Sequence, residues 1–201
     1  MAELKEGDLH PDPFAQFERW FADARESQPE LPEAMTVATC GADGIVSART
    51  CLLKGVDRRG FVFYTNFQSR KGSQIHENPR VALCFYWPRL DRQVRVEGVA
   101  IKVTEQEAEA YFATRPRGSQ LGAWASHQSQ VLMGRGDLDA RVKELEAAYR
   151  DRDVPRPPHW GGFRVIPTSI EFWQGRADRL HDRFVYTLRE AKDWIIERLA
   201  P

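Results

Sequence analysis

Hydrophobic residues recur with two different periods along this chain, and the two periods separate helices from strands. Near the amino end the spacing is three and four residues, the period of one helix face, at Phe14, Phe17, Phe21 and Ala24. Asp12 and Pro13 stand before this run as a typical cap and first helical residue. We therefore predict a helix that begins at Pro13.

Shorter apolar runs follow, separated by turn sequences such as GADG (41–44) and DRRG (57–60), and they predict around eight strands. The runs span residues 34–40, 45–54, 61–66, 80–87, 92–103, 163–167, 169–175, 183–188 and 193–199. Gly98 interrupts the alternation of its run and marks a bulge, which bends a strand at a barrel corner.

Three short helices are predicted between these strands. Ser69 caps one over "SRKGSQIHEN", and Thr104 with Glu107 forms a capping box for a second that ends at "RPRG" (115–118). Asp137 caps the third, whose apolar face contains Leu138, Val142, Leu145 and Tyr149. Because the strands do not alternate with long crossovers, the pattern favours a mainly β, antiparallel barrel with peripheral helices. We expect one domain over residues 1–201, with residues 1–12 as a flexible arm.

The amino-acid composition limits the kinds of molecule that this protein is expected to bind. Lys plus Arg and Asp plus Glu both total 29, so no net field attracts nucleic acid or an anionic membrane. No apolar run approaches the roughly 18 residues of a membrane span, and no signal sequence is visible. Cys40, Cys51 and Cys84 lack paired spacing, which fits free thiols in a reducing compartment. We expect a cytoplasmic protein.

Several polar clusters are candidates for chemistry, each with a simpler structural explanation. Arg70 and Lys71 lie in a helix's first turn, where the positive end of the macrodipole makes cations unfavourable. One explanation is that they bind an anion such as a phosphate. The other is that both are exposed, so that solvent screens their charges and their position costs almost no stability. Tyr111, Arg115 and Ser119 are spaced to donate to one oxyanion, although Arg115 also suits a helix end.

The other polar clusters also have both a functional and a structural explanation. Arg49 and Lys54 flank an apolar strand, and the polar stretch at 127–130 is either a ring-reading segment or a turn. The turn near the carboxyl end concentrates cations and a histidine, at Trp173, Arg176, Arg179, His181 and Arg183. The five histidines lack metal-ligand spacing, and nucleotide-loop and nucleophile-elbow motifs are absent. These residues favour binding of a phosphorylated aromatic cofactor, or of two phosphorylated molecules.

Long motifs in the same order resemble the pyridoxamine 5'-phosphate oxidase family: "RTCLLK", "FYTNFQSRK", "RQVRVEG", "YFATRPRGSQLGAWAS", "WGGFRV", "EFWQG", "RLHDRF" and "RLAP". The resemblance runs from about residue 13 to 201. It implies an FMN-binding split β-barrel of antiparallel Greek-key type, working as a homodimer with FMN at the subunit interface. It also implies oxidation of pyridoxamine 5'-phosphate and pyridoxine 5'-phosphate to pyridoxal 5'-phosphate by O2, yielding H2O2 and, from the amine, ammonia, in vitamin B6 synthesis and salvage.

The family's functional positions carry the expected residue types here. The resemblance implies FMN contacts from Arg49, Thr50, Cys51, Leu52, Leu53, Lys54, Tyr64, Thr65, Arg70, Lys71, Gln93, Gln128, Ser129, Trp173 and Arg183. It implies substrate contacts from Lys54, Tyr111, Arg115, Ser119, Arg179, Leu180 and His181, with Arg179 and His181 beside the reacting carbon. Relatives often have a longer basic amino-terminal arm that closes over the substrate, whereas only "MAELKEGDLH" precedes the first helix here. The alternatives are a phenazine-biosynthesis-type FMN oxidase and a non-catalytic flavin or pyridoxal phosphate binding module.

Overall fold

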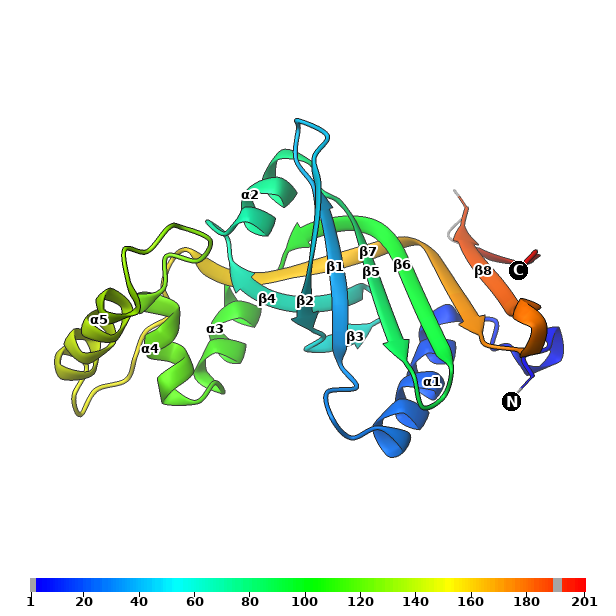
Figure 1. The fold of residues 1–201 in the computed structure, drawn as a ribbon, viewed down its shortest axis with the longest axis horizontal. Helices are drawn as coiled ribbons and strands as arrows, with labels where there is room; N and C mark the ends of the chain where they lie inside the picture. Colours follow the sequence, from blue (N-terminus) through cyan, green and yellow to red (C-terminus); the bar gives the residue numbers. More distant parts are fainter. Residues whose placement is uncertain (1–2, 190–192) are drawn as a thin grey trace.

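A bent antiparallel sheet forms the body of the molecule (Figure 1). The computed structural model describes residues 3–189 and 193–201, and within them nine strands join one sheet in the order β2-β1-β5-β6-β7-β4-β3, with β8 on β7 and β9 on β8. The strands are β1 (Ala34–Cys40), β2 (Val46–Leu52), β3 (Gly55–Asp57), β4 (Gly60–Asn66), β5 (Arg80–Trp87), β6 (Arg92–Lys102), β7 (Trp160–Gln174), β8 (Asp182–Leu188) and β9 (Trp194–Leu199). The predicted split-barrel class is confirmed by this curled sheet.

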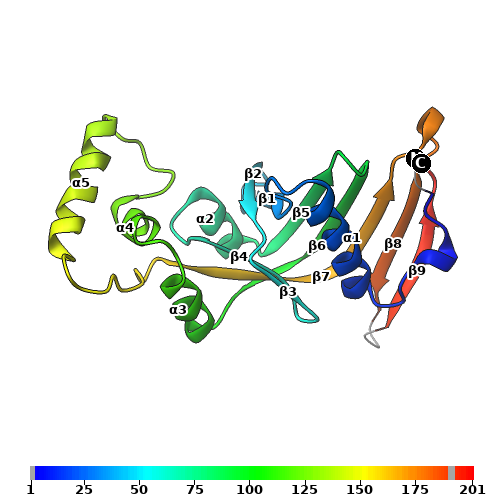
Figure 2. The same cartoon turned by 90° about the horizontal axis from the view of Figure 1, so that it is seen from below.

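Strand β7 runs through the whole molecule and connects its two ends (Figure 2). Its first part pairs with β4, from Trp160 to Val165, and its last part pairs with β8, from Ser169 to Gln174. Two separate strands were predicted here, which was wrong, because the ladder with β6 continues past Pro167. The register shifts at Gly98, where the bulge was predicted, but the extra residue is Thr168 on β7.

The described residues also contain five α-helices, of which α5 packs on α4 rather than on the sheet. They are α1 (Pro13–Ser27), α2 (Arg70–Glu77), α3 (Glu105–Ala113), α4 (Arg117–Ala125) and α5 (Arg135–Ala148), with short 3-10 turns η1 (Glu6–Asp8) and η2 (Ala177–Arg179). The predicted caps Asp12, Ser69 and Thr104 are confirmed. The predicted Asp137 cap is wrong, since α5 begins earlier after Gly134 and has no side-chain cap. Helix α4 was not predicted, because Pro116 and two glycines obscured it.

The core lies between α1 and the curved sheet. Phe17, fully buried, packs edge-on against Phe61 with ring centroids 4.9 Å apart and against Phe85 at 5.1 Å. All four predicted face positions of α1 are buried, together with Trp20. Helices α3, α4 and α5 gather beyond the other end of β7, away from β8, β9 and both chain ends (Figures 1 and 2). Residues of β4 and α4 line a cavity at this end of the molecule.

Candidate functional site

A cavity of about 620 Å³ opens between the edge of the sheet and helices α3 and α4. Strands β2 and β4, the first turn of α2, the α3–α4 connection and the segment after α4 all contribute to its wall. It gathers many of the predicted site residues, namely Thr50, Cys51, Leu52, Lys54, Tyr64, Thr65, Lys71, Tyr111, Arg115, Ser119 and Gln128. Predicted residues up to 78 positions apart in the sequence, from Thr50 to Gln128, therefore line one cavity.

Lys71 is the most enclosed cation of this wall, with 8% of its surface exposed. Its ammonium group donates to Thr65 Oγ1 at 3.0 Å, to Gln128 Oε1 at 3.1 Å and to Ser69 Oγ at 3.4 Å, all of which are neutral oxygens. Burial lowers the pKa of Lys71, and in the part of the chain that the structure describes no carboxylate pairs with its charge. Such an ammonium group has hydrogen-bonding partners but no counter-charge, which suits an anionic ligand.

Two further cations lie near Lys71. Arg49 on β2 donates to Thr39 Oγ1 at 2.6 Å and to Ser47 Oγ at 2.5 Å, and burial lowers its pKa, with the charge of Arg70 acting in the same direction. Arg70 is exposed at the start of α2, and its backbone N–H donates to Ser129 Oγ at 3.2 Å. Three cations thus cluster at one side of the cavity. Neither the Arg49 nor the Arg70 guanidinium lines the cavity itself. Leu53, another predicted FMN contact, does not line it either and is buried in the core.

The opposite wall combines a second cation with stacked aromatic rings. Tyr64 stacks on Tyr111 with centroids 3.9 Å apart, and Trp160 stacks on Tyr64 at 5.4 Å. The Arg115 guanidinium lies over the Trp160 ring, 4.6 Å from its centroid, and its buried Nη1 has no hydrogen-bond partner. Burial lowers the pKa of Arg115 and raises that of the Tyr111 phenol, which therefore stays protonated as a donor.

Counter-charges are missing from this cluster but not from the rest of the molecule. In the described residues, Arg49, Lys54, Arg70, Lys71 and Arg115 form no ion pair with a carboxylate. Arginines elsewhere do, as the pairs of Arg164 with Asp57 and Glu107 show. A set of cations without acids is expected where the ligand brings the negative charge.

The remaining predicted residues form a second group on β6, β7, β8 and η2. Gln93 pairs with Trp173, and Trp173 pairs with Arg183, so the sheet register places the three side by side. The His181 ring packs on Trp173 with centroids 4.5 Å apart. Arg183 Nε donates to the buried Glu171 carboxylate at 2.8 Å.

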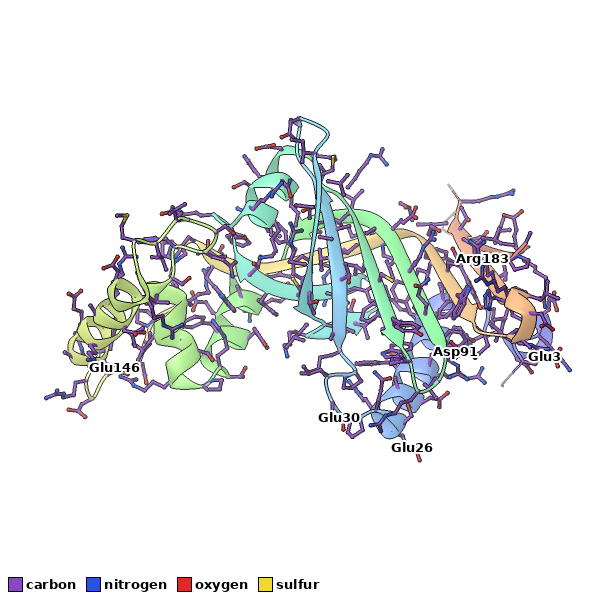
Figure 3. The ribbon with its side chains drawn as sticks, viewed as in Figure 1. Glu3, Glu26, Glu30, Asp91, Glu146 and Arg183 are labelled. Carbon is purple, nitrogen blue, oxygen red and sulfur yellow. The ribbon has the colours of Figure 1, made fainter. Side chains whose placement is uncertain are left out.

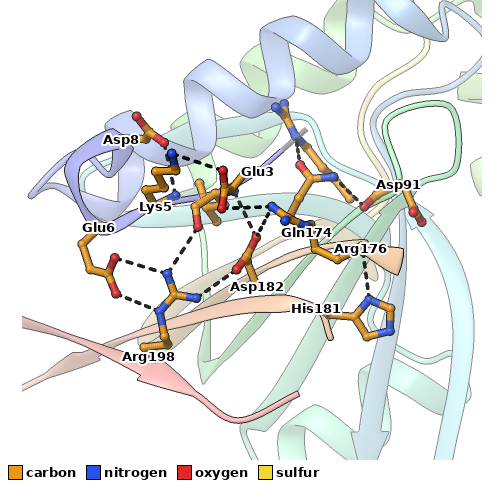
Figure 4. A network of polar contacts seen from close by, with 12 residues as sticks. Glu3, Lys5, Glu6, Asp8, Asp91, Gln174, Arg176, His181, Asp182 and Arg198 are labelled. Carbon is orange, nitrogen blue, oxygen red and sulfur yellow. Dashed lines mark hydrogen bonds and ion pairs between the residues drawn. The ribbon is translucent and has the colours of Figure 1, made fainter. Parts of the chain in front are cut away.

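The turn that follows β7 has an unusual backbone and several polar contacts. Asp178 and Arg179 have φ of 56° and 61°, in the left-handed region that residues with a Cβ seldom adopt. Arg179 and Leu180 are exposed. The Arg176 N–H donates to His181 Nδ1 at 3.1 Å, so a neutral His181 carries its proton on Nε2 (Figure 4).

The amino-terminal segment packs beside this turn (Figure 4). The Leu4 N–H donates to Asp182 Oδ2 at 3.1 Å, while Arg198 donates to Asp182 Oδ1 at 2.9 Å and to Glu6 Oε1 at 2.7 Å. Leu4 itself is 5% exposed. Leu4 and Glu6 of the expected arm therefore have defined contacts with β8 and β9.

One chain cannot bring the two groups together. Tyr64 pairs with Gly162, and Arg183 pairs with Trp173. Gly162 and Trp173 are eleven residues apart on β7, which at about 3.3 Å per residue is about 35 Å. Figure 3 shows Arg183 at the end of the molecule opposite Glu146 of α5. No side chain spans such a distance.

Some residues of the cavity were not predicted. Trp160, Asn66, Thr114, Gly122, Ala123, Pro116 and Ser126 line it as well. The aromatic ring in "HWGGF" was a visible signal for Trp160, but its contact with Arg115 depends on the β4–β7 pairing. In the described residues no cluster of potential metal ligands occurs, and none of the helices there is long and apolar enough to cross a bilayer.

The fold and this cavity define a class: a split β-barrel with a cleft lined by cations and stacked aromatic rings. Within that class, the chain belongs to the pyridoxamine 5'-phosphate oxidase family and is an oxidoreductase. The family model described as "Pyridoxamine 5'-phosphate oxidase" matches residues 21–149, and "Pyridoxine 5'-phosphate oxidase C-terminal dimerisation region" matches residues 160–201.

Relatives and solved structures agree with this assignment. The chain is 58% identical over 200 residues to the pyridoxine/pyridoxamine 5'-phosphate oxidase of Rubrobacter xylanophilus, covering 100% of this chain and 92% of the relative. It is 53% identical to that of Paraburkholderia phymatum, covering 100% and 94%. PhzG from Burkholderia lata, solved with tetrahydrophenazine-1-carboxylic acid, is 33% identical with a TM-score of 0.92, covering 99% of this chain and 98% of PhzG. A related FMN binding protein from Nostoc punctiforme, 16% identical with a TM-score of 0.76 and 96% and 100% coverage, shares the fold.

Proposed function

We propose that this chain binds FMN and oxidises pyridoxamine 5'-phosphate and pyridoxine 5'-phosphate to pyridoxal 5'-phosphate, with O2 as the electron acceptor. The observation that carries the proposal is the pair of cation sites in one cleft, Lys71 on one wall and Arg115 on the other, neither paired with a carboxylate of the described residues. Two phosphorylated ring molecules would each place their phosphate on one of these cations. The names of the relatives at 53–58% identity support the same reaction.

The residues present fit FMN. Lys71, Arg70 and Arg49 would hold its phosphate, because they form a cluster of cations with only neutral hydrogen-bond partners. Gln128 and Ser129 approach the same helix start, and Tyr64 with the 50–54 segment would border the ring. When bound, FMN would supply the redox chemistry, accepting a hydride and passing the electrons to O2 to give H2O2.

The chain's own part in the reaction is to bind and orient the substrate. Arg115, Tyr111, Ser119 and Lys54 would hold the substrate phosphate, with the protonated Tyr111 phenol as a neutral donor. Binding of the phosphate at this site would position the substrate for hydride transfer from its C4' carbon to the flavin. Water would release ammonia from the oxidised amine.

His181 would act as a donor at the ring rather than as a base. Its Nδ1 accepts a hydrogen bond from the Arg176 backbone N–H, which leaves Nε2 to carry the proton of the neutral ring. Arg179 on the strained turn is exposed and forms no ion pair in the described residues, so its charge is free for the substrate.

We further propose that each site is completed by a second copy of the chain. The separation of about 35 Å along β7, at about 3.3 Å per residue, would keep Arg179 and His181 from reaching the cleft of their own chain. A homodimer would bring the Trp173–Arg183 row of one copy to the cleft of the other, and a dimerisation region matches residues 160–201. We also propose a cytoplasmic location, since the three cysteines are free.

An absorbance experiment tests the function. Purified protein should be yellow, and pyridoxine 5'-phosphate should bleach the flavin band without air, with colour and H2O2 returning when air is admitted. Arg179→Ala should lower turnover while keeping FMN, whereas Arg70→Ala with Lys71→Ala should lose FMN. Equal loss of FMN in both variants contradicts this division of roles.

The second candidate is oxidation of a tricyclic carboxylate, favoured by the TM-score of 0.92 to PhzG. That ligand has no phosphate, so it would leave the Arg115 site without its anion. Bleaching by a tetrahydrophenazine carboxylate and not by pyridoxine 5'-phosphate would support it. A protein that binds FMN and pyridoxal 5'-phosphate but makes no H2O2 would instead be a binding module.

A further inference from the structure

Helix α2 carries a buried amide, Gln74, that the proposed reaction does not use. Its exposed fraction is 7%, and its Oε1 accepts two short hydrogen bonds, from Thr39 Oγ1 and from Ser47 Oγ, both at 2.6 Å. Its Nε2 donates to the Ile45 carbonyl at 3.2 Å. This third contact fixes which end of the amide faces the hydroxyl groups.

The two hydroxyl groups connect Gln74 to Arg49. Each gives its single proton to Gln74 Oε1, so the lone pairs of each oxygen remain to accept from the guanidinium. Arg49 Nη1 donates to Thr39 Oγ1 at 2.6 Å and to the Val37 carbonyl at 3.1 Å. Its Nη2 donates to Ser47 Oγ at 2.5 Å. Three neutral groups thus hold the guanidinium, and Gln74 binds two of them.

The network joins an edge strand to the helix that begins with the other cations. Arg49 lies on β2, the last strand at one edge of the sheet, and Gln74 lies one turn beyond Lys71 on α2. A neutral amide at this position leaves the Arg49 charge uncompensated, whereas a carboxylate would pair with it. The arrangement keeps a full positive charge beside Arg70 and Lys71.

We propose that Gln74 is a positioning residue for phosphate recognition: through Thr39 and Ser47 it holds the Arg49 guanidinium where the FMN phosphate binds. This inference rests on the proposed function, because it takes the cation cluster to be the phosphate site. It predicts that Gln74 affects affinity for FMN but not for riboflavin, which has the same ring system without the phosphate.

The test compares dissociation constants for FMN and riboflavin, measured by flavin fluorescence on protein freed of flavin. Gln74→Met keeps the length of the side chain and removes the acceptor, so FMN affinity should fall about tenfold while riboflavin affinity stays within about twofold. Gln74→Glu keeps the acceptor but adds a charge that pairs with Arg49, so it should also weaken FMN alone. Ser73→Ala, an exposed change on the same helix, is the matched control and should bind both flavins like the wild type.

A double-mutant cycle makes the mechanism specific. In an Arg49→Met background, Gln74→Met should cause no further loss of FMN affinity, because both changes act through one guanidinium. An unchanged preference for FMN over riboflavin in Gln74→Met, or an equal loss for both flavins, would overturn the inference. A wild-type protein that does not prefer FMN to riboflavin would instead overturn the proposed function on which it rests.

Discussion

Replacing Arg115 by methionine should separate ligand binding from stability. In the free protein the guanidinium contributes little to folding, because its two main energies oppose each other. Its buried Nη1 without a partner costs about 1–3 kcal/mol, and the contact with Trp160 at 4.6 Å returns about 0.5–2 kcal/mol. We therefore expect Arg115→Met to change the free energy of unfolding by an amount between a loss of about 1 kcal/mol and a gain of about 2.5 kcal/mol.

The effect on the ligand should be much larger. A guanidinium that gives two charge-assisted hydrogen bonds to a phosphate contributes at least about 3 kcal/mol, which is at least about a hundredfold in affinity. The assay is titration of the FMN-loaded variant with pyridoxal 5'-phosphate, beside urea unfolding of the same preparation. Pyridoxal, which lacks the phosphate, should bind the variant and the wild type alike.

Arg117→Met is the matched control for this change. Arg117 is exposed and donates to the Tyr149 and Arg152 carbonyl groups outside the cleft, so its loss should not alter pyridoxal 5'-phosphate affinity. A hundredfold loss in the control, or unaltered affinity in Arg115→Met, would refute the assignment of Arg115 to a phosphate. A loss of more than about 2 kcal/mol of stability would show that the guanidinium is structural.

Three other outcomes are expected. Gly98→Ala should destabilise the fold by about 2 kcal/mol or more in urea unfolding, because the new Cβ would lie 2.2 Å from a carbonyl oxygen of β7. Gly136→Ala is the control and should leave stability unchanged, because its Cβ would meet nothing within 4 Å. Equal effects of the two changes would contradict the close strand contact at the bulge. Arg198 lowers the pKa of Glu6 from 4.5 to about 2, so the stabilising effect of this ion pair is complete above pH 4.5 and is lost as the pH falls toward 2. Between these pH values, the amide exchange rates of residues 3–8 should rise in the wild type. After correction for intrinsic rates, they should not depend on pH in Glu6→Gln. Because burial lowers the pKa of Lys71 and a phosphate would raise it again, FMN affinity should fall as the pH rises through that lowered pKa, and Lys71→Arg should remove this dependence.

Local signals allowed most elements to be predicted. The Asp12 cap, the Thr104 capping box and the Ser69 cap each depend on residues within one turn of each other, and the structure contains all three. Helix α4 was missed because Gly118 and Gly122 have low helix propensity, and it forms instead through its packing against α5.

Long-range pairing could not be predicted from local patterns. Pro167 appeared to end a strand, but it lies opposite Gly98 at the bulge, where a missing N–H is tolerated. That Lys71 and Arg115 line the same cavity likewise depends on the pairing of Tyr64 with Gly162, which no sequence period contains. The residue types of the site were visible in the sequence, and their division into two distant groups required the sheet register.

Mixing two inactive variants tests the central claim, a cleft completed by a second chain, most directly. Arg115→Met damages the cleft and Arg179→Ala damages the turn, and the two positions belong to groups about 35 Å apart along β7. If each site takes Arg115 from one copy and Arg179 from the other, random reassociation makes half of the dimers mixed, each with one intact site. The mixture should then recover about a quarter of wild-type turnover. Turnover no higher than that of either variant alone, with mixed dimers verified by native mass spectrometry, would contradict the account.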